Sequence, residues 1–148
     1  MEDIKLELQV DATADDAWQA WTQSEKVVQW FAPEAHIEPE RGGAYELFWD
    51  PDNHDSMSTK GCEITAFEPP RLLAFTWKGP DQFIDAMNQP EPLTKVEVSL
   101  RERCKKTRIT VVHGGWGDGE EWAEARAWHV KAWGMVIQSL KEYYEKPS

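Results

Sequence analysis

The last thirty residues constrain the fold more than any other stretch. With successive residues placed about 100° apart, a single helical face from 118 to 145 collects most of the large side chains. That face holds Trp122, Arg126, His129, Trp133, Val136, Ile137, Leu140 and Tyr144. Asp118 followed by Glu121 indicates a capped start, and Pro147 follows the end. A long amphipathic helix with so bulky an inner face must be covered by something large.

The chain before this helix alternates apolar and polar residues in short runs, which is typical of half-buried strands. Strands are predicted at 4–10, 35–38, 44–49, 59–67, 72–77, 96–101 and 108–113. Two short helices are expected after the first strand, one capped by Thr13 and one capped by Ser24 and ended by Pro33. Short turns between consecutive strands favour an antiparallel sheet. We therefore predict an α+β fold in which one sheet covers the C-terminal helix.

Composition limits the class of protein. A length of 148 residues predicts a single domain over 1–148, and nine tryptophans with 41% apolar residues exclude a disordered chain. The 16 basic and 27 acidic residues give a net charge of −11, which argues against nucleic acid or an anionic membrane as the main partner. No apolar run reaches the length of a membrane span, and the N-terminus is unlike a signal peptide. The expected location is the cytoplasm, with Cys62 and Cys104 as reduced thiols.

The large side chains suggest a binding cavity between sheet and helix. Aromatic walls suit a small hydrophobic or aromatic molecule, and Arg126 and His129 would be the polar groups that orient it. The candidate ligand-binding residues are Trp49, Phe75, Trp77, Trp122, Arg126, His129 and Trp133. The alternative is that the aromatics only fill the core, Arg126 reaches solvent and His129 is a hydrogen-bonded core histidine.

No metal site, cofactor or catalytic residue is assigned. His113 shares a strand face with Ile109 and Val111 and is expected to approach His129, but the ligand count is too small for a metal. Proton transfer by His129, assisted by Glu63 or Asp85, would fit a cyclase or hydrolase. No serine or cysteine lies in a nucleophile motif, so covalent catalysis is not expected. Whether the protein is an enzyme stays open.

Two further features concern access and partners. The segment 78–93 is long, contains three prolines, and is interpreted as a lid over one end of the core. Trp128 and Met135 are predicted to point away from the inner helical face. If exposed, they would form an apolar surface for a chaperone or for a second copy of the chain. The alternative is that the long loop covers them.

Motifs along nearly the whole chain resemble one protein family. They lie at 13–21, 28–33, 41–45, 61–77 and 107–113, and end with His129, Trp133 and Leu140. As an ordered set they are similar to the activator of heat shock protein 90 ATPase homologue-like branch of the START-like (SRPBCC, Bet v-like) helix-grip superfamily. Ala132 departs from the glycine that many relatives carry, but both residues are small.

The resemblance implies a helix-grip fold, in which a curved antiparallel sheet wraps the C-terminal helix and leaves a cavity between them. It does not decide the function, because the fold hosts carriers, cyclases and co-chaperone domains. Three hypotheses follow. The protein binds a small hydrophobic or aromatic ligand; or it is a co-chaperone-type protein-binding module; or it is a cyclase-like or hydrolase-like enzyme using His129.

Overall fold

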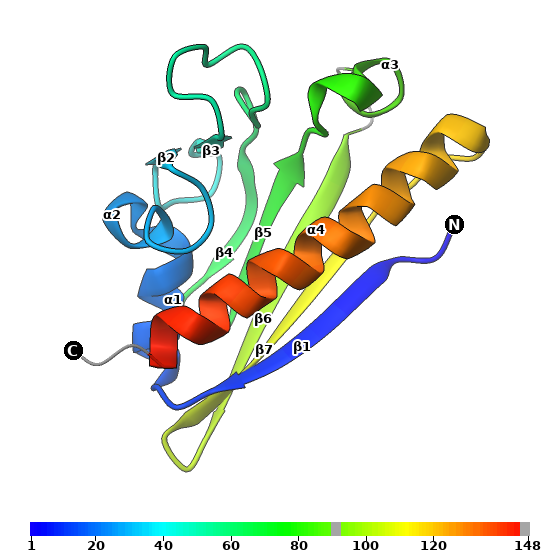
Figure 1. Ribbon diagram of the computed structural model, residues 1–148. Helices are drawn as coiled ribbons and strands as arrows, with labels where there is room; N and C mark the ends of the chain where they lie inside the picture. Colours follow the sequence, from blue (N-terminus) through cyan, green and yellow to red (C-terminus); the bar gives the residue numbers. More distant parts are fainter. Residues whose placement is uncertain (90–92, 146–148) are drawn as a thin grey trace.

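The computed structural model describes residues 1–89 and 93–145 and contains the predicted antiparallel sheet (Figure 1). Its five strands follow the order β1-β7-β6-β5-β4. They are β1 (Ile4–Val10), β4 (Ile64–Glu68), β5 (Leu72–Trp77), β6 (Thr94–Arg103) and β7 (Lys106–Gly114). In β6 every second side chain from Thr94 to Leu100 is buried and those between are exposed, as the period of two predicts. One face of the sheet is therefore apolar.

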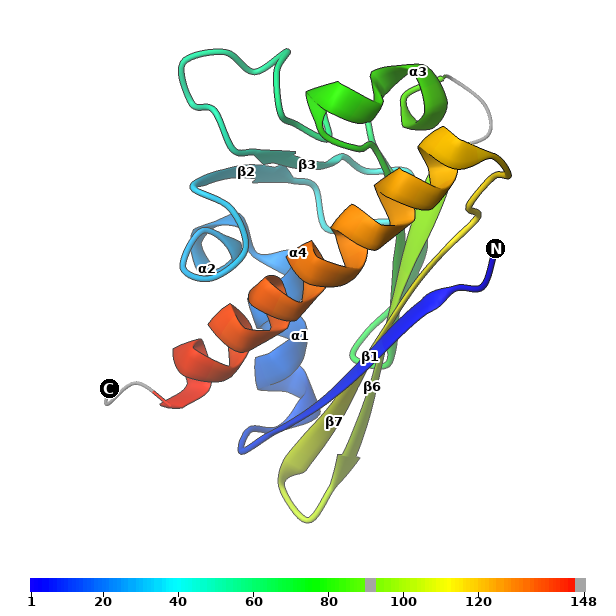
Figure 2. The ribbon, with the colours of Figure 1, turned by 45° about the vertical axis from the view of Figure 1, so that its right-hand side comes forward.

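Helix α4 (Glu120–Glu145) lies across that apolar face, as the sequence predicts (Figure 2). The residues that it buries are Ala125, His129, Trp133 and Leu140. The helix begins two residues later than expected. Asp118 has a fully exposed carboxylate, and Gly119 adopts φ 110°, a left-handed conformation that glycine accommodates without strain.

The predicted strands do not all join one sheet. β2 (Glu34–Ile37) and β3 (Tyr45–Phe48) form a separate antiparallel pair, linked to the chain around 58–63 by the isolated bridges Ala44↔Glu63 and Phe48↔Ser58 and by hydrogen bonds such as Tyr45 N–H to the Cys62 carbonyl, 2.9 Å. The strand predicted at 59–67 is regular only from Ile64, because the chain turns at Gly61, where φ is 88°. The prediction of a single sheet was wrong at this edge.

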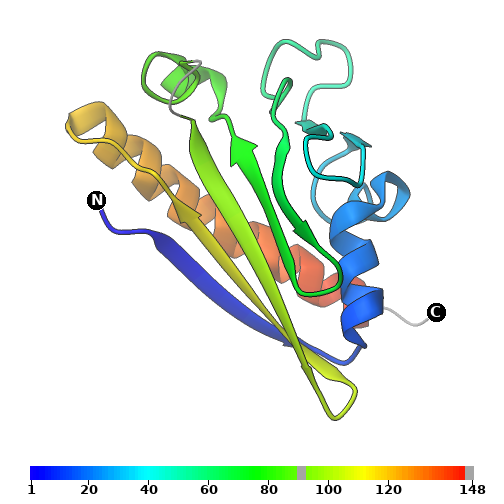
Figure 3. The same cartoon turned by 180° about the vertical axis from the view of Figure 1, so that it is seen from behind.

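Helices α1 (Ala14–Thr22) and α2 (Ser24–Val27) close one end of the molecule, beside β4 and next to the C-terminal end of α4 (Figure 3). Thr13 caps α1 as predicted, since its side chain accepts a 3.2 Å hydrogen bond from the Asp16 backbone N–H. Ser24 does not cap α2. Its hydroxyl instead accepts a 3.0 Å bond from the Ile37 backbone N–H, which ties α2 to β2.

The segment interpreted as a lid has structure of its own. It contains a 3-10 turn, η1 (Asp81–Phe83), and helix α3 (Ile84–Met87). The Asn88 side chain closes the segment at its base, because it accepts a 2.8 Å bond from the Gly79 N–H and donates a 3.2 Å bond to the Gly79 carbonyl. Residues 90–92 of the predicted lid lie outside the described part of the chain.

Two general features complete the description. In the part of the chain that the structure describes, none of the helices has the length and apolar character needed to cross a membrane. Cys62 is buried and Cys104 is exposed, and both are free thiols.

The packing of α4 on the sheet gives a stability prediction. Replacing fully buried Leu140 by alanine should lower the free energy of unfolding by roughly 2–5 kcal/mol, because the loss of apolar burial adds to the cost of a cavity. The matched control on the same helix is Met135→Ala, whose side chain is 73% exposed and should change stability by at most about 0.5 kcal/mol. Urea denaturation followed by circular dichroism measures both. Equal effects of the two substitutions would contradict the helix orientation.

Candidate ligand-binding pocket

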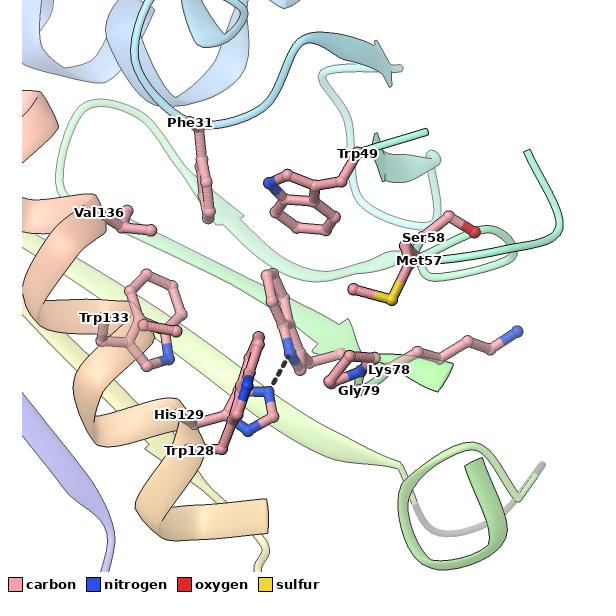
Figure 4. A pocket seen from close by; sticks show the side chains of 13 residues that line it. Phe31, Trp49, Met57, Ser58, Lys78, Gly79, Trp128, His129, Trp133 and Val136 are labelled. Atoms are coloured by element: carbon pink, nitrogen blue, oxygen red, sulfur yellow. Dashed lines mark hydrogen bonds between the residues drawn. The ribbon is translucent and has the colours of Figure 1, made fainter. Parts of the chain in front are cut away.

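A pocket of about 240 Å³ lies between α4, the end of β5 and two loops (Figure 4). Its lining is almost entirely apolar. The lining residues are Phe31, Trp49, Met57, Ser58, Trp77, Lys78, Gly79, Pro80, Trp128, His129, Ala132, Trp133 and Val136. This is the kind of concave, aromatic surface that small-molecule sites use, with a volume just below their usual range of roughly 300–1,000 Å³.

Periodicity on α4 places one wall of the pocket. The pocket residues of this helix share one face. Ala132 and Trp133 lie three and four residues after His129, and Val136 lies four and three residues after those two. Trp77 points up from the end of β5 against this wall, with its ring 5.6 Å from that of Trp133. Phe31 contacts both rings: it stacks on Trp77 at a ring separation of 6.1 Å and an angle of 19°, and lies 5.7 Å from Trp133.

Two histidines join the helix to the sheet beneath the pocket. The Trp77 indole N–H donates to His129 Nε2 over 3.2 Å, and His129 Nδ1 lies 2.8 Å from the Ala125 carbonyl (Figure 4). Because Nε2 accepts, Nδ1 must carry the proton and donate. Both nitrogens of His129 are thus occupied by protein groups.

His113 on β7 is bound in the opposite tautomer. Its Nδ1 accepts a 2.9 Å bond from the Trp133 indole, so its Nε2 carries the proton and donates to Thr94 Oγ1 over 2.9 Å. The rings of His113 and His129 lie 5.4 Å apart, which confirms the predicted approach of the two side chains. In the described part of the chain, no group of three or more histidine, cysteine, aspartate or glutamate side chains is arranged to hold a metal ion.

Burial keeps both imidazoles neutral. Desolvation lowers the pKa of His129 to about 4, partly offset by the bond to the Ala125 carbonyl. Burial, and then the neighbouring His129, lower the pKa of His113 well below its usual value. A neutral His129 with no free lone pair is poorly suited to take a proton from a ligand. Glu63 and Asp85, its suggested helpers, are exposed and do not line the pocket.

The mouth of the pocket is closed on one side by two loops that are bound to each other. The Asp81 carboxylate accepts a 3.0 Å bond from the Met57 backbone N–H and a further bond from the Ser56 hydroxyl. These bonds lower the pKa of Asp81, the backbone bond contributing most. Met57 adopts φ 49°, an uncommon conformation for this residue type, and its side chain lines the pocket.

The pocket and the two histidines lie within a stretch shared with known proteins. Residues 11–145 match the sequence profile of the family described as Activator of Hsp90 ATPase homolog 1-like protein. The chain belongs to this family. The resemblance inferred from the sequence motifs is thereby confirmed. No curated protein matches the chain in sequence.

Solved structures support the same fold for this Activator of Hsp90 ATPase homolog 1-like chain. A Mesorhizobium loti protein aligns over 99% of both chains with a TM-score of 0.78 at 17% identity. The Aha1 dimer from Colwellia psychrerythraea aligns over 98% of this chain and 97% of its own, with a TM-score of 0.74 and 17% identity. An HSP90 activator from Plasmodium falciparum aligns over 99% of both chains, with a TM-score of 0.74 and 13% identity. At such identities the likeness shows the helix-grip fold alone.

Four of the seven predicted site residues meet in the pocket of this family member: Trp49, Trp77, His129 and Trp133. The other three lie elsewhere. Phe75 is buried below the pocket, stacked on Tyr45 at 3.9 Å. Trp122 packs near Trp116, at a ring separation of 6.2 Å.

Arg126 does not turn into the pocket, contrary to the prediction. Its Nε donates a 2.8 Å bond to the Glu2 carbonyl, next to the start of β1. A helical wheel shows that Arg126 is on the covered side of α4 but not which neighbour covers it. Here the neighbour is a backbone carbonyl near the N-terminus, which satisfies the guanidinium at the edge of the sheet.

The sequence missed Phe31, Met57, Lys78 and Trp128 as lining residues. Trp128 was expected on the outer face with Met135. It is 39% exposed but reaches around the helix, with its ring 4.8 Å from His129 and 6.3 Å from Phe83 in the lid segment. The length of an indole side chain explains the difference, because a helical wheel records only the direction of the Cβ atom. Met135 remains on the outer face.

The neutral histidines predict a dependence of stability on pH. The unfolded chain takes up a proton on His129 near its ordinary pKa of 6.5, whereas the folded chain does so only near 4. The contribution of His129 to stability is therefore complete above pH 6.5 and falls by roughly 1.4 kcal/mol per pH unit as the pH drops through this window, and the lowered pKa of His113 adds a loss in the same direction. Urea denaturation at several pH values between 7 and 4.5 measures the slope.

A substitution at His129 tests whether this residue causes the dependence of stability on pH. His129→Gln should reduce the pH dependence of the free energy of unfolding, whatever its effect on stability at pH 7, because glutamine does not titrate. His36→Gln is the matched control at an exposed position and should leave the dependence unchanged. A slope that persists undiminished in His129→Gln would refute the assignment.

Proposed function

We propose that the protein binds a small, flat, apolar molecule between α4 and the sheet. The observation that carries this proposal is the 240 Å³ pocket whose wall consists largely of indole rings. An apolar cavity of about 150 Å³ holds one benzene molecule, so this pocket suits one or two fused rings. Burial of that apolar surface supplies the driving force for binding.

The hydrogen-bonding groups of the pocket indicate how such a ligand would be oriented. The inner donors are already used, since Trp77 donates to His129 and Trp133 donates to His113. Among the described residues, no partner binds the indole N–H of Trp49 or Trp128, which lie at the partly exposed mouth. An apolar body inside and a hydrogen-bond acceptor at the mouth therefore fit this arrangement best.

Lys78 also contributes to the lining, but its side chain extends away from the other lining residues (Figure 4). Its ammonium donates a 2.6 Å bond to the Lys60 carbonyl and retains two further protons for other acceptors. The donors left for a ligand acceptor at the mouth are therefore the indole N–H groups of Trp49 and Trp128. The ligand class that we propose is accordingly an aromatic molecule bearing a carboxylate or another acceptor, of which a naphthoate is the simplest probe.

Filling the pocket should abolish binding. Ala132→Leu adds three carbons to the pocket wall on a helix that favours leucine, so 2-naphthoate should bind about tenfold more weakly or not at all. Met135→Leu is the control on the exposed face of the same helix. Quenching of tryptophan fluorescence during titration gives the dissociation constants. If the native protein does not bind the probe, or binds it as well after Ala132→Leu, the proposal fails.

The orientation of the ligand is tested in the same assay. Trp49→Phe should weaken binding of 2-naphthoate several-fold more than binding of uncharged naphthalene, because only the carboxylate loses a hydrogen-bond donor. An equal loss of affinity for 2-naphthoate and naphthalene would show that the carboxylate binds elsewhere. Native mass spectrometry of protein purified from its host would identify a small molecule that remains bound.

A second candidate function is a co-chaperone-type interaction, favoured by the family description and by the names of two structural relatives. Met135 is 73% exposed on the outer face of α4, and Trp128, although it lines the pocket, is 39% exposed, so both offer apolar surface to a partner. A proton-transfer role for His129 is less well supported, since both of its nitrogens are engaged. A cytoplasmic location stays a prediction.

The co-chaperone candidate predicts a change in the ATPase rate of the host's Hsp90 when the protein is added. Met135→Ala and Trp128→Ala together should reduce that change several-fold, as loss of central apolar contacts does at other interfaces. The pocket-filling Ala132→Leu serves as the control and should leave the rate unaffected. An unaltered ATPase rate with the native protein would count against this function.

A further inference from the structure

The turn between β6 and β7 concentrates positive charge on an acidic protein. Five of the chain's 16 basic residues fall within the eight residues 101–108, although the net charge is −11. We call this surface the basic hairpin tip, and its residues are Arg101, Arg103, Lys105, Lys106 and Arg108. All five side chains are exposed.

Strand pairing sets these charges directly against each other. In the register of β6 and β7, Arg101 lies opposite Arg108 and Arg103 lies opposite Lys106. They occupy the outer face of the sheet, because Leu100 and Ile109 of the same strands are buried in the core. Like charges opposite one another in a sheet are destabilising, so this arrangement works against the fold.

The turn itself is also unfavourable. Cys104 and Lys105 adopt φ values of 55° and 64°, a conformation that two-residue hairpins usually assign to asparagine and glycine. Uncommon backbone conformations of this kind are often retained where they serve a function. The basic hairpin tip therefore combines two independent unfavourable features: repulsion between opposed charges and an uncommon backbone conformation in the turn.

The basic residues of the tip lack acidic partners in the described part of the chain. Within residues 1–89 and 93–145, none of its five cations forms an ion pair. Glu102, the acidic residue within the run, is engaged with α1, where its carboxylate accepts a 2.7 Å bond from the Ala14 backbone N–H. The view from behind shows the hairpin extending beyond β4 and β5, at the end of the sheet away from α3 (Figure 3).

We propose that the basic hairpin tip is a docking surface for an acidic segment of a partner protein. Neighbouring strands are about 4.8 Å apart and alternate residues along a strand about 7 Å apart, so the charges form a grid that an extended acidic peptide matches. Such a segment would also offset the repulsion between the opposed arginines. This proposal does not depend on the pocket.

The remaining charge of the molecule favours a short acidic segment over a nucleic acid or a membrane. Outside the tip the chain carries a large acidic excess. A long polyanion or an anionic bilayer would bring its charge near this excess, within the Debye length of about 10 Å at 0.1 M salt. A short peptide segment contacts the tip alone and avoids this repulsion.

The test measures binding of a fluorescein-labelled peptide of eight glutamates to the full chain by fluorescence anisotropy, at low and at physiological salt. The double variant Arg101→Glu/Arg108→Glu should weaken binding by about tenfold or more, because two attractions become repulsions. Lys131→Glu/Lys141→Glu is the matched control, since it makes the same change of net charge on exposed positions of α4. The control should bind the peptide nearly as well as the native chain.

Three outcomes would overturn the proposal: no binding by the native chain, an equal loss in the control, or tighter binding of octauridylate or phosphatidylserine vesicles than of the peptide. A second measurement does not rely on the double variant. The single substitution Arg108→Glu places opposite charges across the strands. It should raise the midpoint of thermal unfolding and weaken binding of the peptide. A lowered thermal midpoint would show that repulsion between the opposed arginines does not destabilise the fold.

Discussion

The structure depends on burying two imidazoles between a helix and a sheet. A polar group taken out of water must be hydrogen-bonded, and here every nitrogen of His113 and His129 has a partner. Two of those partners are indoles from the opposite layer: Trp133 on α4 reaches His113 on β7, and Trp77 on β5 reaches His129 on α4. A slide or rotation of α4 would break both bonds in an apolar interior, so the pair fixes the register of helix against sheet.

The same arrangement explains why a pocket remains. Indoles committed to hydrogen bonds cannot rotate to fill the adjacent space, and Ala132 is too small to do so. The loops joined through Asp81 then close one side of the opening. The inner wall is left apolar and the unused donors lie at the rim. The chemical character of the pocket thus follows from the packing of the core.

The pocket and the basic hairpin tip lie at different ends of the sheet and rest on different physics. Binding in the pocket depends on apolar burial, which salt hardly weakens. Binding at the basic hairpin tip depends on exposed charge, which salt screens. A helix-grip fold can carry both, because its core fixes the backbone while its loops and hairpin ends vary freely. Membership of the family sets the fold, and these two surfaces are where this chain's own chemistry is to be sought.

The sequence by itself determined the strands, the first two helices and the C-terminal helix in their order, though not η1 and α3, because a period of two marks strands and a period near 3.6 marks a helix whatever surrounds them. It also placed Trp77, His129 and Trp133 on inward faces. Only the tertiary structure decided which inward residues share a cavity. Arg126 is bound by a carbonyl 124 residues away, Trp128 reaches the pocket from the outer side, and Phe31 arrives from a separate loop. Periodicity gives the direction of a side chain, whereas its neighbour depends on contacts between distant segments.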